Sequence, residues 1–129
     1  MRNAMRWTLA CLFLIVAAQA WSASVVDIFM CQQDEEATKA DLERVAKNWL
    51  AAARSMDGGA DLELYLRFPV VASIGNSDFA AVLVAPSLEM WGKFMDGFEG
   101  SPAAKVGKEE FSELADCTDN QLWEVIKIE

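Results

Sequence analysis

Three side chains at alternate positions, Glu63, Tyr65 and Arg67, combine a carboxylate, a phenol and a guanidinium. They alternate with leucines, which predicts a strand with the leucines buried and these three on the other face. A carboxylate whose pKa is raised by burial can act as a general base, and a nearby guanidinium can stabilise an enolate. We expect Asp27 to join this face, so the catalytic candidates are Asp27, Glu63 and Arg67, and Tyr65 and Arg67 are candidate ligand contacts.

A second interpretation of the same side chains involves no catalysis. Alternating charges on the outer face of a strand are usually solvated, or paired across a dimer interface. The sequence leaves both interpretations open.

An apolar candidate site surrounds Trp91. Met90, Phe94 and Met95 lie beside it in the chain and are suited to forming a pocket wall. We therefore take Trp91 and Phe94 as ligand-binding candidates. The alternative is ordinary core packing, the usual role of tryptophans on a helix face that meets a sheet, and it applies equally to Trp49.

The composition excludes several classes of chemistry. The chain has no histidine, which removes Ser-His-Asp and Cys-His nucleophiles, imidazole-bound zinc and histidine-ligated haem. Its 20 acidic and 11 basic residues give a net charge of -9, which repels nucleic acids and anionic membranes. The acids at 34–36 lack calcium-loop spacing, and no nucleotide-binding or acyl-transfer motif occurs. We expect no metal, no cofactor and no nucleic acid partner.

The first 20 residues predict a secretory signal peptide. Arg2 and Arg6 precede an apolar run over residues 7–18, and Ala18-Gln19-Ala20 has the small-x-small pattern of a cleavage site. An uncleaved anchor is the alternative, although this run is shorter than the roughly 20 residues that span a bilayer. We expect a secreted or periplasmic protein, free of the membrane after cleavage, with one domain over residues 21–129.

Two cysteines, Cys31 and Cys117, remain after cleavage. An exported chain folds in an oxidising compartment, so we expect them to form a disulfide. Two buried thiols are the alternative.

The remaining pattern predicts helices and strands in a defined order. One helix begins at the capping box Thr38–Asp41 and continues to about Met56, where Gly58-Gly59 ends it. A second begins after Ser87, with Leu88, Trp91, Met95 and Phe98 on its buried stripe, and Ser101-Pro102 starts a third. The expected strands cover residues 25–31, 62–68, 79–85 and 122–128.

This order of elements is that of the ferredoxin-like βαββαβ sandwich, an α+β fold with helices on one face of a four-stranded antiparallel sheet. The first and last strands are antiparallel neighbours in this topology. The end of the first strand therefore lies near the start of the last, which brings Cys31 toward Cys117.

The sequence resembles the dimeric α+β barrel superfamily, and within it a group of exported proteins. The resemblance is carried by Cys31 after the first strand, Trp49 in the next helix, residues 79–85 leading to Trp91, and Cys117 before the last strand. It implies a homodimer whose paired sheets form a barrel around a small-molecule pocket. Some relatives are cofactor-independent monooxygenases of the antibiotic-biosynthesis type; haem-degrading relatives use histidine, which this chain lacks. No catalytic motif of theirs is present here.

We therefore expect an exported protein that binds a small apolar or aromatic molecule, either between its sheet and helices or across a dimer barrel. A cofactor-independent monooxygenase or isomerase is one alternative. A structural homodimer without a ligand is the other. Whether the protein is an enzyme stays open at this stage.

Overall fold

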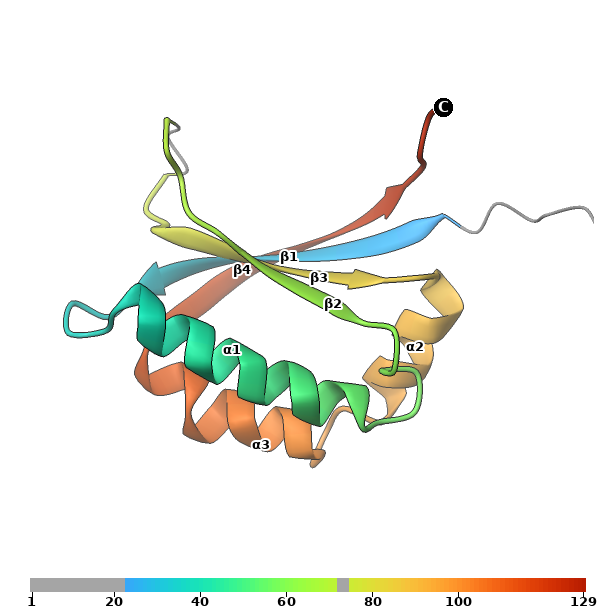
Figure 1. The fold of residues 1–129 in the computed structure, drawn as a ribbon, viewed down its shortest axis with the longest axis horizontal. Coiled ribbons are helices and arrows are strands. Elements are labelled where there is room, and N and C mark those ends of the chain that lie inside the picture. The colour runs from blue at the N-terminus through green and yellow to red at the C-terminus, as the bar shows by residue number, and fades with distance from the viewer. Residues whose placement is uncertain (1–22, 72–74) are drawn as a thin grey trace, which may run out of the picture.

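The computed structural model describes residues 23–71 and 75–129. In these residues helices cover one face of a four-stranded antiparallel sheet and leave the other face open (Figure 1). The α+β, ferredoxin-like prediction is confirmed. The expected signal peptide lies outside the described residues. The elements, in chain order, are β1 (Ser24–Gln33), α1 (Lys39–Arg54), β2 (Glu63–Arg67), β3 (Phe79–Ala85), α2 (Leu88–Asp96), α3 (Pro102–Glu109), a 3₁₀ turn (Phe111–Glu113) and β4 (Ala115–Val125).

The strand order is β2-β3-β1-β4, so β1 and β3 are central and β2 and β4 form the edges. The central place of β3 follows from its sequence, FAAVLVA, which is apolar on both faces. The pairing of β1 with β4 brings together the first and last strands, as the predicted topology requires.

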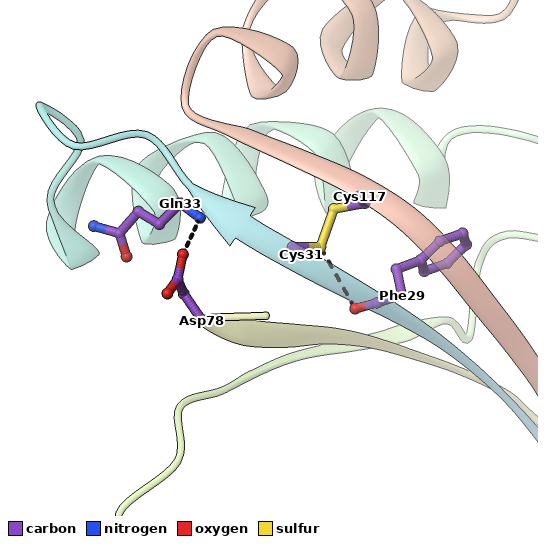
Figure 2. Close-up of a disulfide and its surroundings, with 5 residues drawn as sticks. All are labelled: Phe29, Cys31, Gln33, Asp78 and Cys117. Carbon is purple, nitrogen blue, oxygen red and sulfur yellow. Dashed lines mark hydrogen bonds between the residues drawn. A yellow bond between two sulfur atoms is a disulfide. The ribbon is translucent and has the colours of Figure 1, made fainter. Parts of the chain in front are cut away.

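Cys31 and Cys117 form a disulfide between β1 and β4 (Figure 2), as expected. They are directly opposite each other in the strand register, and their Cα atoms are 4.0 Å apart. Beside this bridge the backbone N–H of Gln33 donates a hydrogen bond of 2.8 Å to the Asp78 carboxylate, which ties the end of β1 to the start of β3 (Figure 2).

The predicted limits of the last strand were wrong. β4 begins at Ala115 rather than residue 122, so Cys117 lies within the strand, and it ends at Val125. The polar stretch 118–121 hid its start, because both faces of this edge strand are exposed there and no alternation of apolar residues is required. Ile126 and Ile128 follow the strand and are exposed.

The predicted helix starts are confirmed. Thr38 and Asp41 form the reciprocal capping box of α1, and the side chains of Ser87 and Ser101 cap α2 and α3. The predicted end of α1 was late, since the helix stops at Arg54. Gly58 instead lies in the following turn with a φ of 78°, where a Cβ atom would come within 2.6 Å of the Met90 carbonyl oxygen. Glycine is needed there for close approach to α2.

The predicted buried stripe of α2 is also corrected. Leu88 and Met95 are 59% and 39% exposed, whereas Phe94 is only 1% exposed. Trp91 and Phe98 do pack against the core as expected. The buried face is therefore that of residues 91, 94 and 98, and the short helix turns its first residue to solvent. None of the helices in the described residues is long and apolar enough to cross a membrane.

Candidate functional site

Glu63, Tyr65 and Arg67 are exposed on one face of β2, as their alternation predicts. They lie opposite Val84, Val82 and Ala80 of β3 on the open face of the sheet. The Tyr65 hydroxyl donates a hydrogen bond to the Glu63 carboxylate. That bond and the Glu63 charge raise the pKa of the Tyr65 phenol above its usual value, because both favour the protonated form.

Asp27 does not join this open face, and the expectation that it would is wrong. It lies opposite Leu83 in the β1–β3 register, and Leu83 belongs to the core beneath the helices. Asp27 is 2% exposed. Side chains alternate along a strand, so its position places it on the helix-covered face with Phe29 and Cys31 rather than with the residues opposite Glu63 and Arg67.

The buried Asp27 carboxylate has few polar neighbours. The side-chain amide of Asn120 on β4 donates a hydrogen bond of 3.3 Å to Oδ1. The Trp91 indole also interacts with the carboxylate, although its buried N–H makes no well-aligned hydrogen bond. Burial raises the pKa of Asp27 above its usual value, and the interactions with Asn120 and Trp91 oppose this rise.

The sheet therefore separates the catalytic candidates into two groups. Asp27 is on the helix-covered face, and Glu63 and Arg67 are on the open face. A mechanism in which Asp27 removes a proton while Arg67 stabilises the resulting enolate cannot be assembled around one ligand within one chain.

A cavity of about 200 Å³, partly open to solvent, lies between the sheet and the helices. All four strands contribute to its wall, together with α1, α3 and the segments that flank α3. The lining residues are Phe29, Ala46, Trp49, Leu64, Leu66, Ala81, Leu83, Phe98, Gly107, Phe111 and Cys117. No ionisable side chain is among them.

The ligand-binding candidates named from sequence are not in this wall. Phe94 is buried in the core, Trp91 packs beside it, and Tyr65 and Arg67 lie on the open face. Sequence reasoning missed Trp49 as a cavity residue. The small residues Ala46, Ala81 and Gly107 leave space between the sheet and the helices, and they were the feature of the sequence that could have indicated a cavity. Recognising them requires knowing which helix faces pack against which face of the sheet.

The Cys31–Cys117 disulfide borders the cavity, since Cys117 is one of its lining residues. The cavity wall is thus covalently fixed where β1 meets β4. Within the described residues no group of histidine, cysteine, aspartate or glutamate side chains could hold a metal ion.

The sequence matches no protein-family model and no curated protein. Among solved structures the chain is similar to a hydroxynitrile lyase from Passiflora edulis, with 13% identity, a TM-score of 0.53, and coverage of 83% of this chain and 95% of the other. It is also similar to SnoaB, a cofactor-independent oxygenase from Streptomyces nogalater, with 11% identity, a TM-score of 0.52, and coverage of 83% and 97%. A DABB family protein with a ferredoxin-like fold from Mesorhizobium loti shares 7% identity, with a TM-score of 0.52 and coverage of 84% and 100%.

These similarities extend over most of this chain and nearly all of each solved structure. They agree with the fold that the superfamily resemblance implied. At these identities they concern the fold alone.

Proposed function

We propose that the protein is exported and binds a small apolar molecule in the cavity between its sheet and its helices. The observation that carries this proposal is a space of about 200 Å³ whose wall holds only apolar and aromatic side chains and the disulfide. An engineered apolar cavity of about 150 Å³ is large enough for benzene. The cavity described here therefore suits a molecule built on a single ring.

Filling the cavity tests the proposal. Ala46 lies on α1 and lines the space, so Ala46→Leu occupies it without disturbing helix propensity. Ala51 is exposed on the same helix, so Ala51→Leu is the matched control. Isopropylbenzene is the probe, and its binding is measured by calorimetry and by the rise in melting temperature with ligand concentration.

We expect the original chain and Ala51→Leu to bind isopropylbenzene with equal affinity, and Ala46→Leu to bind at least tenfold more weakly. Equal binding by all three proteins would place the ligand elsewhere. No binding to the original chain would favour the structural alternative, in which the fold carries no ligand.

We further propose that two copies pair through the open sheet face. This face carries the β3 residues Ala80, Val82 and Val84 at its centre, and Tyr65 and Trp123 on the edge strands. Ala80 and Val82 are only 6% and 7% exposed, so the water-exposed apolar area is that of Tyr65 and Trp123, which are more than half exposed. A partner surface would stabilise this exposed area. A second copy of the chain supplies an identical apolar face, and pairing of identical faces gives a closed dimer.

The pairing is tested by placing a charge on the face. Trp123→Glu is expected to convert a dimer into a monomer in native mass spectrometry. Leu88→Glu is the control, because Leu88 is similarly exposed but lies on α2 on the helix side. A monomeric original chain, or a dimer that survives Trp123→Glu and not Leu88→Glu, would contradict the proposal.

A second candidate function is a cofactor-independent oxygenase or isomerase. Its support is Asp27, a buried carboxylate with a raised pKa on the helix-covered face, adjacent in the sheet to the cavity residues Phe29 and Leu83. Asp27 does not itself line the cavity, so in this candidate the ligand has to extend past Phe29 and Leu83 to give its proton to the carboxylate. The structural similarity to SnoaB fits this candidate at the level of fold.

Oxygen uptake with 1,3,5-trihydroxybenzene, an activated single-ring phenol, tests the oxygenase candidate. Asp27→Asn is expected to lower uptake at least a hundredfold, within the range of general-base contributions. Arg67→Ala, on the opposite face, is expected to leave uptake unchanged. Equal rates of oxygen uptake by Asp27→Asn and the original chain, or no uptake by the original chain, would contradict the oxygenase candidate.

A further inference from the structure

Trp49 is held in one orientation at the cavity wall. It projects from α1, and its ring packs edge-on against Phe94 with ring centroids 6.0 Å apart and an interplanar angle of 76°. A second contact, with Phe98, has a centroid distance of 6.5 Å. Contacts with two aromatic rings restrict the rotation of the indole, so its N–H has a defined position.

That N–H edge of the indole lies beside Gly107 of α3. A Cβ atom added to Gly107 would be 3.7 Å from the Trp49 Nε1 atom and 3.8 Å from its Cδ1 atom. Both residues line the cavity. Because glycine has no side chain, nothing from this position of α3 covers the indole nitrogen, and the polar edge of Trp49 is left at the cavity wall.

The Trp49 N–H has no hydrogen-bond partner among the described residues. It is also the only side-chain nitrogen or oxygen carried by the residues that line the cavity. The indole nitrogen of Trp91 is different, because it is fully buried and lies away from the cavity. An indole N–H in an apolar site usually finds an acceptor, since leaving it unpaired is unfavourable.

We propose that the ligand is a neutral, ring-sized molecule with one hydrogen-bond acceptor, such as a carbonyl oxygen, and that the Trp49 N–H binds this acceptor. This inference rests on the ligand site proposed above. The apolar wall accommodates the hydrocarbon part, and the single donor orients the molecule. A carboxylate would enter this cavity without a cation to compensate its charge, which is strongly unfavourable. The same donor selects a ketone or aldehyde over the hydrocarbon of equal shape.

Acetophenone and isopropylbenzene test this selection, because they have nearly the same shape and only the first has an acceptor. Trp49→Phe removes the N–H and keeps an aromatic ring. One neutral hydrogen bond corresponds to roughly a threefold to tenfold change in affinity. We expect Trp49→Phe to weaken acetophenone binding by that factor and to leave isopropylbenzene binding within about twofold of the original.

Trp91→Phe is the matched control, since it removes the other indole N–H of the helix layer without touching the cavity wall. It is expected to leave the affinity ratio of the two probes unchanged. Equal weakening of both probes by Trp49→Phe would overturn the inference while the cavity proposal stands. Failure of the original chain to bind either probe would overturn the proposed function, and the inference with it.

A measurement on the original chain keeps the inference testable if Trp49→Phe does not fold. The infrared carbonyl stretch of bound acetophenone is expected at lower frequency than in hexane, because a hydrogen bond weakens the C=O bond. A bound carbonyl that absorbs as it does in hexane would show that no donor contacts the oxygen, and the inference would be wrong.

Discussion

Among residues 23–71 and 75–129, Asp27 is the one aspartate that is buried, and its environment favours the neutral acid. Desolvation disfavours the charged form, and the Asn120 hydrogen bond and Trp91 compensate only in part, so the pKa of Asp27 is raised. A buried carboxyl of this kind makes the folded state hold its proton to higher pH than the unfolded chain does. The Asp27 carboxyl therefore lowers the stability of the folded state at neutral pH.

This environment predicts a pH-dependent difference between the original chain and Asp27→Asn. As pH rises through 3.8, the ordinary pKa of an aspartate side chain, the unfolded chain loses the Asp27 proton first, so the contribution of this group to stability falls until pH exceeds its folded-state pKa. Asparagine does not ionise. We therefore expect Asp27→Asn to gain stability relative to the original chain between pH 3 and pH 7.

Urea unfolding at several pH values measures this difference. Asp61→Asn is the control, because Asp61 is exposed and lies outside the sheet. A stability difference that stays constant with pH would show that folding does not shift the Asp27 pKa, and one that favours the original chain as pH rises would show that the Asp27 carboxylate is stabilised in its charged form.

At the scale of elements, single polar side chains decide where the helices begin. Thr38 accepts a hydrogen bond of 3.2 Å from the Asp41 backbone N–H, and the Asp41 carboxylate accepts one of 3.0 Å from the Thr38 backbone N–H. The hydrogen bonds from Thr38 also lower the pKa of Asp41. Both hydrogen bonds stabilise the first turn of α1. The same helix places Ala46 and Trp49 at the cavity wall.

Thr38→Ala is therefore expected to lower the free energy of unfolding by about 1 kcal/mol. The loss should be reduced in Thr38→Ser, whose hydroxyl can still accept from the Asp41 N–H. Chemical denaturation gives both values. Equal losses for the alanine and serine variants would mean that the threonine methyl group, rather than the hydroxyl, is responsible.

The elements also show how far the sequence determines the structure. Caps and apolar periodicity predicted the starts of the helices, the central β3 and the face shared by Glu63 and Arg67, because each is a local property of the chain. The start of β4 and the side of the sheet on which Asp27 lies were predicted wrongly, because both depend on the register with neighbouring strands. The cavity wall depends on which small residues face each other across layers, which local pattern does not reveal.

At the scale of the whole molecule, the disulfide links the first strand to the last across a sequence separation of 86 residues. A cross-link that closes a loop of this length stabilises the folded state by roughly 4 to 5 kcal/mol on the loop-entropy model. For a small domain this is a large share of the roughly 5 to 15 kcal/mol of total stability. The bridge also fits the proposed export, since disulfides persist in oxidising compartments.

Replacing both cysteines by alanine is expected to lower the free energy of unfolding by about 2 to 5 kcal/mol. Reduction of the original chain should lower it by a similar amount, and reductant should have no effect on the alanine variant. Urea unfolding with and without reductant compares these states. Equal stability of the oxidised and reduced chains would show that the cross-link contributes nothing to folding.

The same bridge makes the body of the protein a covalent ring. α1, β2, β3, α2 and α3 all lie between Cys31 and Cys117, and the sequence after β2 continues into Val70 and Val71, which are 97% and 94% exposed. A protease that cuts beside these valines opens the ring without releasing a fragment. The nicked chain stays one molecule until a reductant separates it into two pieces, so an oxidising compartment tolerates a cut that a reducing one does not.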